Sequence, residues 1–214
     1  MHTYRTIEEQ DDRIETTYEI QKSKFITHLA HVETEEAARE FIQAMKKRYF
    51  DARHNCSAYV LGETSAQQKS NDDGEPGGTA GNPILEAIKK NGLTNIVVVV
   101  TRYFGGIKLG AGGLIRAYSH AAACGIEAAT ILEMTPFAEL AVTIGYDLLA
   151  ACEHYQRQNA IRSAAADYSD NVTLNLLVPP AEIEAVAADI TNLTAGRAKI
   201  KQGAEKLLAL PVKI

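Results

Sequence analysis

The residues most able to do chemistry gather around a glycine-rich segment in the middle of the chain. Five of the nine residues after Phe104 are glycines. Glycine lets backbone N–H groups approach a ligand closely, and a following helix presents unpaired donors at the positive end of its dipole. Cations beside such donors favour an anionic partner. The candidate anion-binding residues are Arg102, Gly105, Gly106, Lys108, Gly110, Gly112, Gly113 and Arg116.

The spacing of these glycines matches no established phosphate-binding motif. It fits neither Gly-x-x-x-x-Gly-Lys-Ser/Thr nor Gly-x-Gly-x-x-Gly, so neither a P-loop nor a dinucleotide fingerprint is indicated. A tight, well-packed turn without a ligand is an equal alternative. For each arginine, a salt bridge to an acidic loop earlier in the chain is the simpler explanation.

Three carboxylates within four residues form a second candidate site. Asp72, Asp73 and Glu75 could bind a divalent cation or supply an acid or a base. They could equally be exposed turn residues, because Asp-Gly and Pro-Gly are standard turn dipeptides. His54 opens a predicted strand and could carry protons in the same cleft. The candidate catalytic residues are therefore His54, Asp73 and Glu75, with Asp72 and Thr79 as further binding candidates.

A strand and two helices must position these groups. Residues 96–100 form an unbroken β-branched run that predicts a central strand covered on both faces, and residues 117–129 predict an alanine-rich helix. A second helix is expected to begin at Asn82 as N-cap, with Pro83 at its first position. Glycines precede both helices, which suggests a cleft shared by their two N-termini.

The rest of the first half alternates between strands and a helix. Apolar periodicity predicts strands over residues 14–20, 24–32 and 54–61. Thr34 is expected to cap a helix with an apolar stripe that lies on the sheet. Residues 62–81 show no periodic pattern and predict a long loop.

The second half predicts a separate domain. Residues 134–136 are typical of a linker, and the elements that follow have the βαββαβ order of a ferredoxin-like fold, with a short hairpin turn at residues 170–171. We expect a domain over residues 1–134 and another over 137–214, in an α+β chain. The expected elements of the second domain are strands over 138–145, 160–169, 172–178 and 196–203 and helices over 148–158 and 181–193.

Composition narrows the class of protein. The 214 residues are 46% hydrophobic and 23% charged, as in ordinary globular proteins, and the formal net charge of −5 disfavours a general polyanion binder. Three widely spaced cysteines favour neither disulfides nor a zinc site. We expect no metal, no cofactor and no membrane association, and a cytoplasmic location.

Four segments together carry a family resemblance. They are residues 22–26, 52–59, 71–85 and 101–118, in that order, and they resemble the signature of the IMPACT family, closest to its bacterial YigZ branch. The resemblance spans nearly the whole chain. Gly77 departs from it, because the run Glu-Pro-Ser-Gly-Thr-Ala-Gly would place serine there, and this chain therefore lacks that hydroxyl.

The resemblance implies a fold and a link to translation. The first domain should be an α/β sandwich like the second domain of a small-subunit ribosomal protein, a fold shared with elongation factors and with certain small-molecule kinases. The second should resemble a domain of elongation factor G. Eukaryotic members regulate translation through a partner that bacteria lack, so their mechanism does not transfer to the bacterial branch.

Three functions are compatible with the sequence. The first is a non-enzymatic, translation-linked protein that binds RNA or a ribosome-associated partner through an anion-binding cleft in the first domain. The alternative is an enzyme that acts on a phosphorylated or anionic small molecule. The third is a compact scaffold whose partner surface lies elsewhere.

Overall fold

The computed structural model describes residues 1–9 and 14–212, which divide into two compact units. The N-terminal unit contains His2–Met134 together with residues 209–212, and the C-terminal unit contains Thr135–Leu208. None of the helices among the described residues is long and apolar enough to span a membrane.

The N-terminal unit is built on a five-stranded antiparallel sheet with strand order β2-β3-β6-β4-β5. Its centre is β6, whose run of valines is completely buried, so the predicted central strand is confirmed. The side chains of such a strand alternate between two apolar layers. The strands are β2 (Ile14–Ile20), β3 (Ser23–His31), β4 (His54–Leu61), β5 (Gln67–Asn71) and β6 (Ile96–Tyr103).

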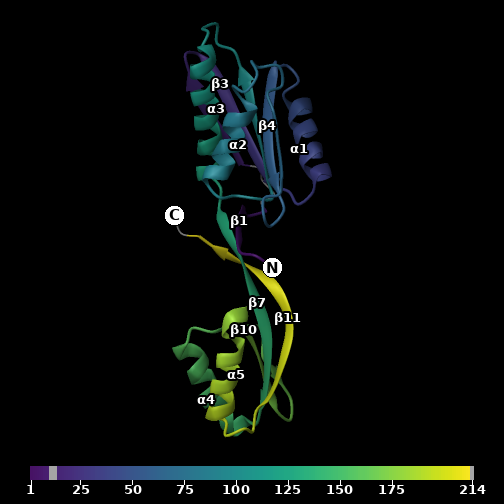
Figure 1. Cartoon of the computed structure of the whole chain (residues 1–214), viewed down its shortest axis with the longest axis vertical. Coiled ribbons are helices and arrows are strands. Elements are labelled where there is room, and N and C mark those ends of the chain that lie inside the picture. The colour runs from purple at the N-terminus through teal and green to yellow at the C-terminus, as the bar shows by residue number, and fades with distance from the viewer. Residues whose placement is uncertain (10–13, 213–214) are drawn as a thin grey trace. The chain divides into compact units, whose positions relative to one another are not determined.

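Helices cover both faces of this sheet (Figure 1). α2 (Gly81–Lys90) and α3 (Gly110–Glu127) pack on the face that includes Val98 and Val100. α1 (Glu35–Arg48) packs on the face that includes Val97 and Val99. The predicted α/β sandwich is therefore confirmed.

Three local predictions in this unit require correction. The predicted loop over residues 62–81 contains the edge strand β5, whose polar side chains hide its strand pattern. α2 begins at Gly81, and Asn82 does not cap it, because its amide oxygen accepts a hydrogen bond from Ser70. α3 begins at Gly110, seven residues before the predicted start, so three of the candidate glycines lie in its first turn.

The helix capped by Thr34 is confirmed. The Thr34 side chain accepts a hydrogen bond from the amide of Ala37, and Glu35 and Glu36 lie in the first turn, where the helix dipole favours acids. The stripe that includes Phe41 and Met45 is buried as expected.

The predicted linker at residues 134–136 is wrong, because the chain continues there as one strand. β7 spans Ile131–Ile144, and its first four residues pair with β1 (Tyr4–Ile7). Pairing with β10 (Val172–Val178) begins at Ala138. Pro136 lies between these two registers.

The C-terminal unit has the predicted ferredoxin-like order. β7 is followed by α4 (Tyr146–Gln158), and β10 by a short 3₁₀ turn and α5 (Ile183–Leu193). The predicted strand over 160–169 is only two short pieces, β8 (Arg162–Ser163) and β9 (Asp167–Tyr168). β11 (Lys199–Pro211) pairs with β7 and continues well beyond residue 203.

Candidate functional site

A pocket of about 310 Å³ lies in the N-terminal unit where the ends of several elements meet. β4 contributes His54 at its first residue, and β6 contributes Arg102 near its last. These two residues are direct partners in the register of the two strands. The loop after β5 contributes Glu75, and the start of α3 contributes Gly110. The pocket therefore contains five of the predicted residues, His54, Glu75, Arg102, Lys108 and Gly110.

The buried arginine of this pocket is held by an acid. Nη1 of Arg102 donates to Oε1 of Glu75 over 2.7 Å, and the two side chains are only 7% and 3% exposed. The same carboxylate oxygen accepts a hydrogen bond of 2.8 Å from the hydroxyl of Tyr118. Salt-bridge formation by Arg102 is thus one of the two explanations given by the sequence, and it fixes Glu75 in place.

Glu75 does not use all the donors of Arg102. Nη2 is 3.5 Å from Oγ of Ser23, at the limit of a hydrogen bond, and the buried Nε has no hydrogen-bond partner among the described residues. A buried N–H without a partner is costly, and its presence calls for an explanation. The guanidinium carbon lies 5.5 Å from the ring centroid of Phe25 and 5.6 Å from that of Phe104.

The helix end at this pocket is open. The N-cap of α3 is Leu109, which provides no side-chain hydrogen bond, and the first turn contains no acid. The first amides of a helix have no intrahelical acceptor, so Gly110 and Ala111 bring unpaired donors to the pocket wall.

Two exposed cations add positive charge. Arg53 and Lys108 line the pocket, and neither has an ion-pair partner within the described part of the chain. Since Glu75 balances Arg102, these two cations and the α3 dipole leave the pocket positively biased. The arrangement can hold an anion.

His54 is oriented by the acidic loop. Its Nδ1 lies 2.9 Å from the carbonyl oxygen of Asp73, and a carbonyl can only accept. Nδ1 must therefore carry a proton, and in the neutral tautomer that this contact selects, Nε2 is the acceptor nitrogen.

Asp72 and Asp73 organise the loop. The Asp72 carboxylate accepts backbone hydrogen bonds from Gly78, Ala80 and Gly81, at 2.8, 3.0 and 2.8 Å. Burial raises the pKa of Asp72, but these three donors together outweigh it and hold the pKa below its usual value. The N-terminus of α2 is thus filled by the protein's own carboxylate and adds nothing to a shared cleft.

Like Asp72, Asp73 is engaged in hydrogen bonds within the protein. Its oxygens accept from Nζ of Lys46 over 2.5 Å and from the amide of Asn55 over 2.7 Å. No group of three His, Cys, Asp or Glu side chains among the described residues could hold a metal ion, so the three neighbouring acids form no cation cage.

The other predicted site residues lie outside the pocket. Thr79 donates to the carbonyl of Pro76, and Gly112 lies on the exposed side of α3. Gly105 packs against the backbone of Lys22, where a Cβ would come within 2.0 Å, and Gly106 takes a φ of +85°. Gly113 and Arg116 line a neighbouring hollow that shares Leu109 with the pocket.

Burial makes the nearby thiol and phenol poor nucleophiles. Burial is the main reason that the pKa of Cys56 rises to about 12, and burial likewise raises the pKa of Tyr118 far above its usual value. The Cys56 thiol donates its one hydrogen to the carbonyl of Asp72 over 2.9 Å, and its sulfur lies 3.4 Å from the Tyr118 hydroxyl oxygen. Both groups stay protonated at neutral pH, and they hold the acidic loop through their contacts with Asp72 and Glu75.

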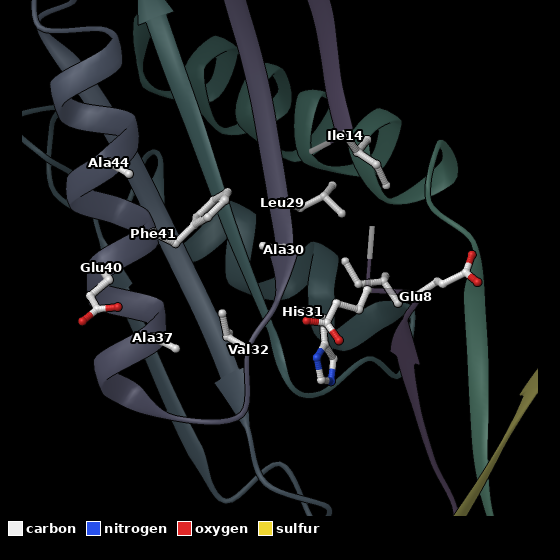
Figure 2. Close-up of a pocket in the computed structure, with 12 residues that line it drawn as sticks. Glu8, Ile14, Leu29, Ala30, His31, Val32, Ala37, Glu40, Phe41 and Ala44 are labelled. Carbon is white, nitrogen blue, oxygen red and sulfur yellow. The ribbon is translucent and has the colours of Figure 1, made fainter. Parts of the chain in front are cut away.

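A second pocket, of about 360 Å³, lies between α1 and β3 (Figure 2). Phe41 and Leu29 form part of its apolar wall, and Glu8, Glu9 and Glu40 are among its lining residues. None of the predicted site residues lines it. Its acids disfavour an anion there, so we assign the candidate site to the first pocket.

Among the lining residues that sequence reasoning missed are one cation and one aromatic ring. Arg53 immediately precedes the strand that His54 opens, and Phe104 immediately follows the strand that contains Arg102. Both flank predicted residues by one position, and the exposed end of a strand beside a predicted cleft is the signal that could have identified them.

Comparisons with known proteins agree with the predicted resemblance. The model of the Impact N-terminal domain matches residues 21–126, and that of the domain of unknown function DUF1949 matches residues 142–197. IMPACT family member YvyE of Bacillus subtilis is 44% identical over 95% of this chain and 92% of its own length. IMPACT family member YigZ of Escherichia coli is 37% identical over 83% and 88%. A solved structure described as a crystal structure of an hypothetical protein is 34% identical, with a TM-score of 0.60 and coverage of 94% of this chain and 97% of that one.

Proposed function

The chain belongs to the IMPACT family, and from that premise we propose that it is a translation-linked, non-enzymatic protein that binds RNA or a ribosome-associated partner through the pocket at Arg102. Of these two partners, RNA suits the pocket better. The translation link is what resemblance to this family implies. The contact that we propose is between the pocket and an RNA phosphate.

The observation that carries this proposal is the open end of α3 beside a buried arginine. Gly110 and Ala111 bring uncapped amides to the wall, and the buried Nε–H of Arg102 has no partner among the residues that the structure describes. A phosphate oxygen would satisfy the amides of the helix, the buried Arg102 would add its positive charge from within the wall, and Arg53 and Lys108 would neutralise the charge of the phosphate. The volume of about 310 Å³ is small for a ligand site and suits one phosphate with part of its sugar.

The hydrogen bonds that Glu75 and Asp73 already accept favour binding over catalysis. Glu75 is committed to Arg102 and Tyr118, and Asp73 to Lys46 and Asn55. A general acid or base must be within reach of the substrate and free to exchange a proton. Neither carboxylate has that freedom.

Binding of a fluorescent single-stranded RNA, followed by anisotropy over a range of salt concentrations, tests the proposal. Lys108→Ala should weaken binding of every RNA sequence and make the negative slope of log K against log salt shallower by about 0.7, the value for one lost phosphate contact on a single strand. Lys90→Ala is the control, because Lys90 is an exposed lysine at the end of α2 that does not line the pocket. The proposal fails if RNA does not bind at low salt, or if the two variants behave alike.

A second candidate, an enzyme acting on a phosphorylated small molecule, is supported by one observation. The hydrogen bond from His54 to the carbonyl of Asp73 leaves Nε2 as a base in an anion-holding pocket. A thermal-shift screen of mononucleotides and sugar phosphates would separate the candidates, since stabilisation grows with the concentration of a true ligand. Stabilisation and turnover that are lost in His54→Gln would favour the enzyme.

A further inference from the structure

Phe104 is an exposed aromatic ring at the wall of the anion pocket. It is 52% exposed, whereas Phe25, the other ring that contacts Arg102, is completely buried. Phe25 is therefore part of the core that supports the arginine. The Phe104 ring contacts the Arg102 guanidinium and still leaves about half of its surface open to solvent at the pocket wall, where a ligand can reach it.

The backbone next to this ring is held in place. The next residue, Gly105, lies so close to the turn between β2 and β3 that an added Cβ would be 2.0 Å from the carbonyl oxygen of Lys22. The Gly105 amide also donates to Oγ of Ser23 over 3.2 Å. A ring on a fixed backbone has less conformational entropy to lose when a ligand stacks on it.

We propose that Phe104 is a stacking platform for a base of single-stranded RNA whose phosphate occupies the pocket. The inference rests on the proposed function and specifies the form of its ligand. Aromatic side chains beside a cationic groove bind single strands, because an unpaired base offers its face to the ring. In a duplex, those faces are covered by neighbouring base pairs.

The surface beside the pocket can continue the strand. The neighbouring hollow that shares Leu109 with the pocket has a volume of about 340 Å³ and is lined in part by Gln21, Arg116 and His120. Arg116 is exposed and has no ion-pair partner in the described part of the chain. Ile107 and Ile115 are each 44% exposed and enlarge the apolar surface near the same loop and helix. A cation on each side of Leu109 suits consecutive phosphates of one strand.

The absence of tryptophan from the sequence allows a direct test. Phe104→Trp introduces the chain's one indole at the proposed platform, and Phe50→Trp introduces it at a phenylalanine that is 84% exposed and does not line the pocket. A base that stacks on an indole quenches its fluorescence. Titration with single-stranded RNA should quench position 104 in a saturable manner and leave position 50 unchanged, and a duplex of the same sequence should quench neither.

Phe104→Leu removes the ring and keeps apolar volume. It should weaken binding of single-stranded RNA by about tenfold, within the range for loss of one stacked base, while Phe104→Trp should retain binding. Phe104 also contacts Arg102, so a strand without bases, an abasic ribose-phosphate oligomer, serves as the control. Its affinity should be the same for the wild type and Phe104→Leu.

Failure of this inference and failure of the proposed function give different results. If RNA binds and depends on Lys108 but Phe104→Leu binds as well as the wild type, phosphate recognition stands and the stacking role is wrong. The same holds if duplex RNA binds as tightly as a single strand. If no RNA binds to any variant, the proposed function itself fails, and an exposed Phe104 would then suit a contact with a protein partner.

Discussion

Glu75→Gln should destabilise the N-terminal unit strongly. The substitution preserves the size of the side chain and removes the charge that balances Arg102, whose side chain is 7% exposed. It also removes the charged acceptor of the Tyr118 hydroxyl. Leaving one charge of a buried pair without its partner costs about 3 to 5 kcal/mol in measured cases, and we expect a loss of free energy of unfolding in that range.

The assay must report on one unit, because the chain has two compact units and need not unfold in a single step. Native-state hydrogen exchange read by mass spectrometry gives a separate free energy of opening for peptides from β6 and α3. The matched control is Glu86→Gln. Its side chain is 67% exposed and pairs with Lys89 on the surface of α2, so the loss should be below about 0.5 kcal/mol.

A paired replacement separates stability from binding. In Glu75→Leu/Arg102→Met both charges are absent, and a buried ion pair replaced by apolar groups is often neutral or stabilising. We expect the double variant to recover most of the stability that Glu75→Gln loses and to bind no anion. A loss below about 1 kcal/mol in Glu75→Gln would refute the reasoning, because the pair would then not be the buried, mutually dependent contact described above.

Three further outcomes are expected. The folded-state pKa of Asp72 lies below its usual value, so the carboxylate contributes its full stabilisation above about pH 4 and loses it as the pH falls further. Asp72→Asn should therefore lower the free energy of unfolding at pH 7. Urea titrations of the variant should also show a smaller decrease of that free energy at acid pH. Gly105→Ala should cost about 2 kcal/mol or more in chemical denaturation, since its Cβ would overlap the backbone of Lys22. Gly77→Ser should change stability by less than about 0.5 kcal/mol, since, apart from its chain neighbours, none of the described residues comes within 4 Å of the new Cβ. Cys56, with a pKa of about 12, should resist alkylation at pH 8 while the partly exposed Cys124 reacts, as mass spectrometry of the native protein would show.

The sequence predicts the layers of the fold well where apolar periodicity is strong. The buried valines of β6, the Thr34 cap and the order of elements in the C-terminal unit each follow from local pattern. It fails where polar or glycine residues adopt regular structure because of their neighbours. β5 is polar because it is an edge strand, and the first turn of α3 tolerates three glycines because Leu114 and later residues anchor the helix.

The candidate site was only partly predictable, for a related reason. Periodicity places His54 and Arg102 at strand ends, and their pairing in the sheet brings them together. The roles of the acids depend on which donor each carboxylate meets, and spacing cannot show this. Asp72 meets the amides of its own loop and helix, whereas Glu75 meets Arg102.

The central claim is that the open end of α3 and Arg102 together hold a phosphate. Titration of ¹⁵N-labelled protein with inorganic phosphate, followed by NMR, tests it directly. We predict saturable shifts of the Gly110 and Ala111 amides and of the Arg102 Nε–H resonance, with no shift of the Gly81 amide, which already donates to Asp72. Unchanged resonances at Gly110, Ala111 and Arg102, or equal shifts at both helix ends, would contradict the account.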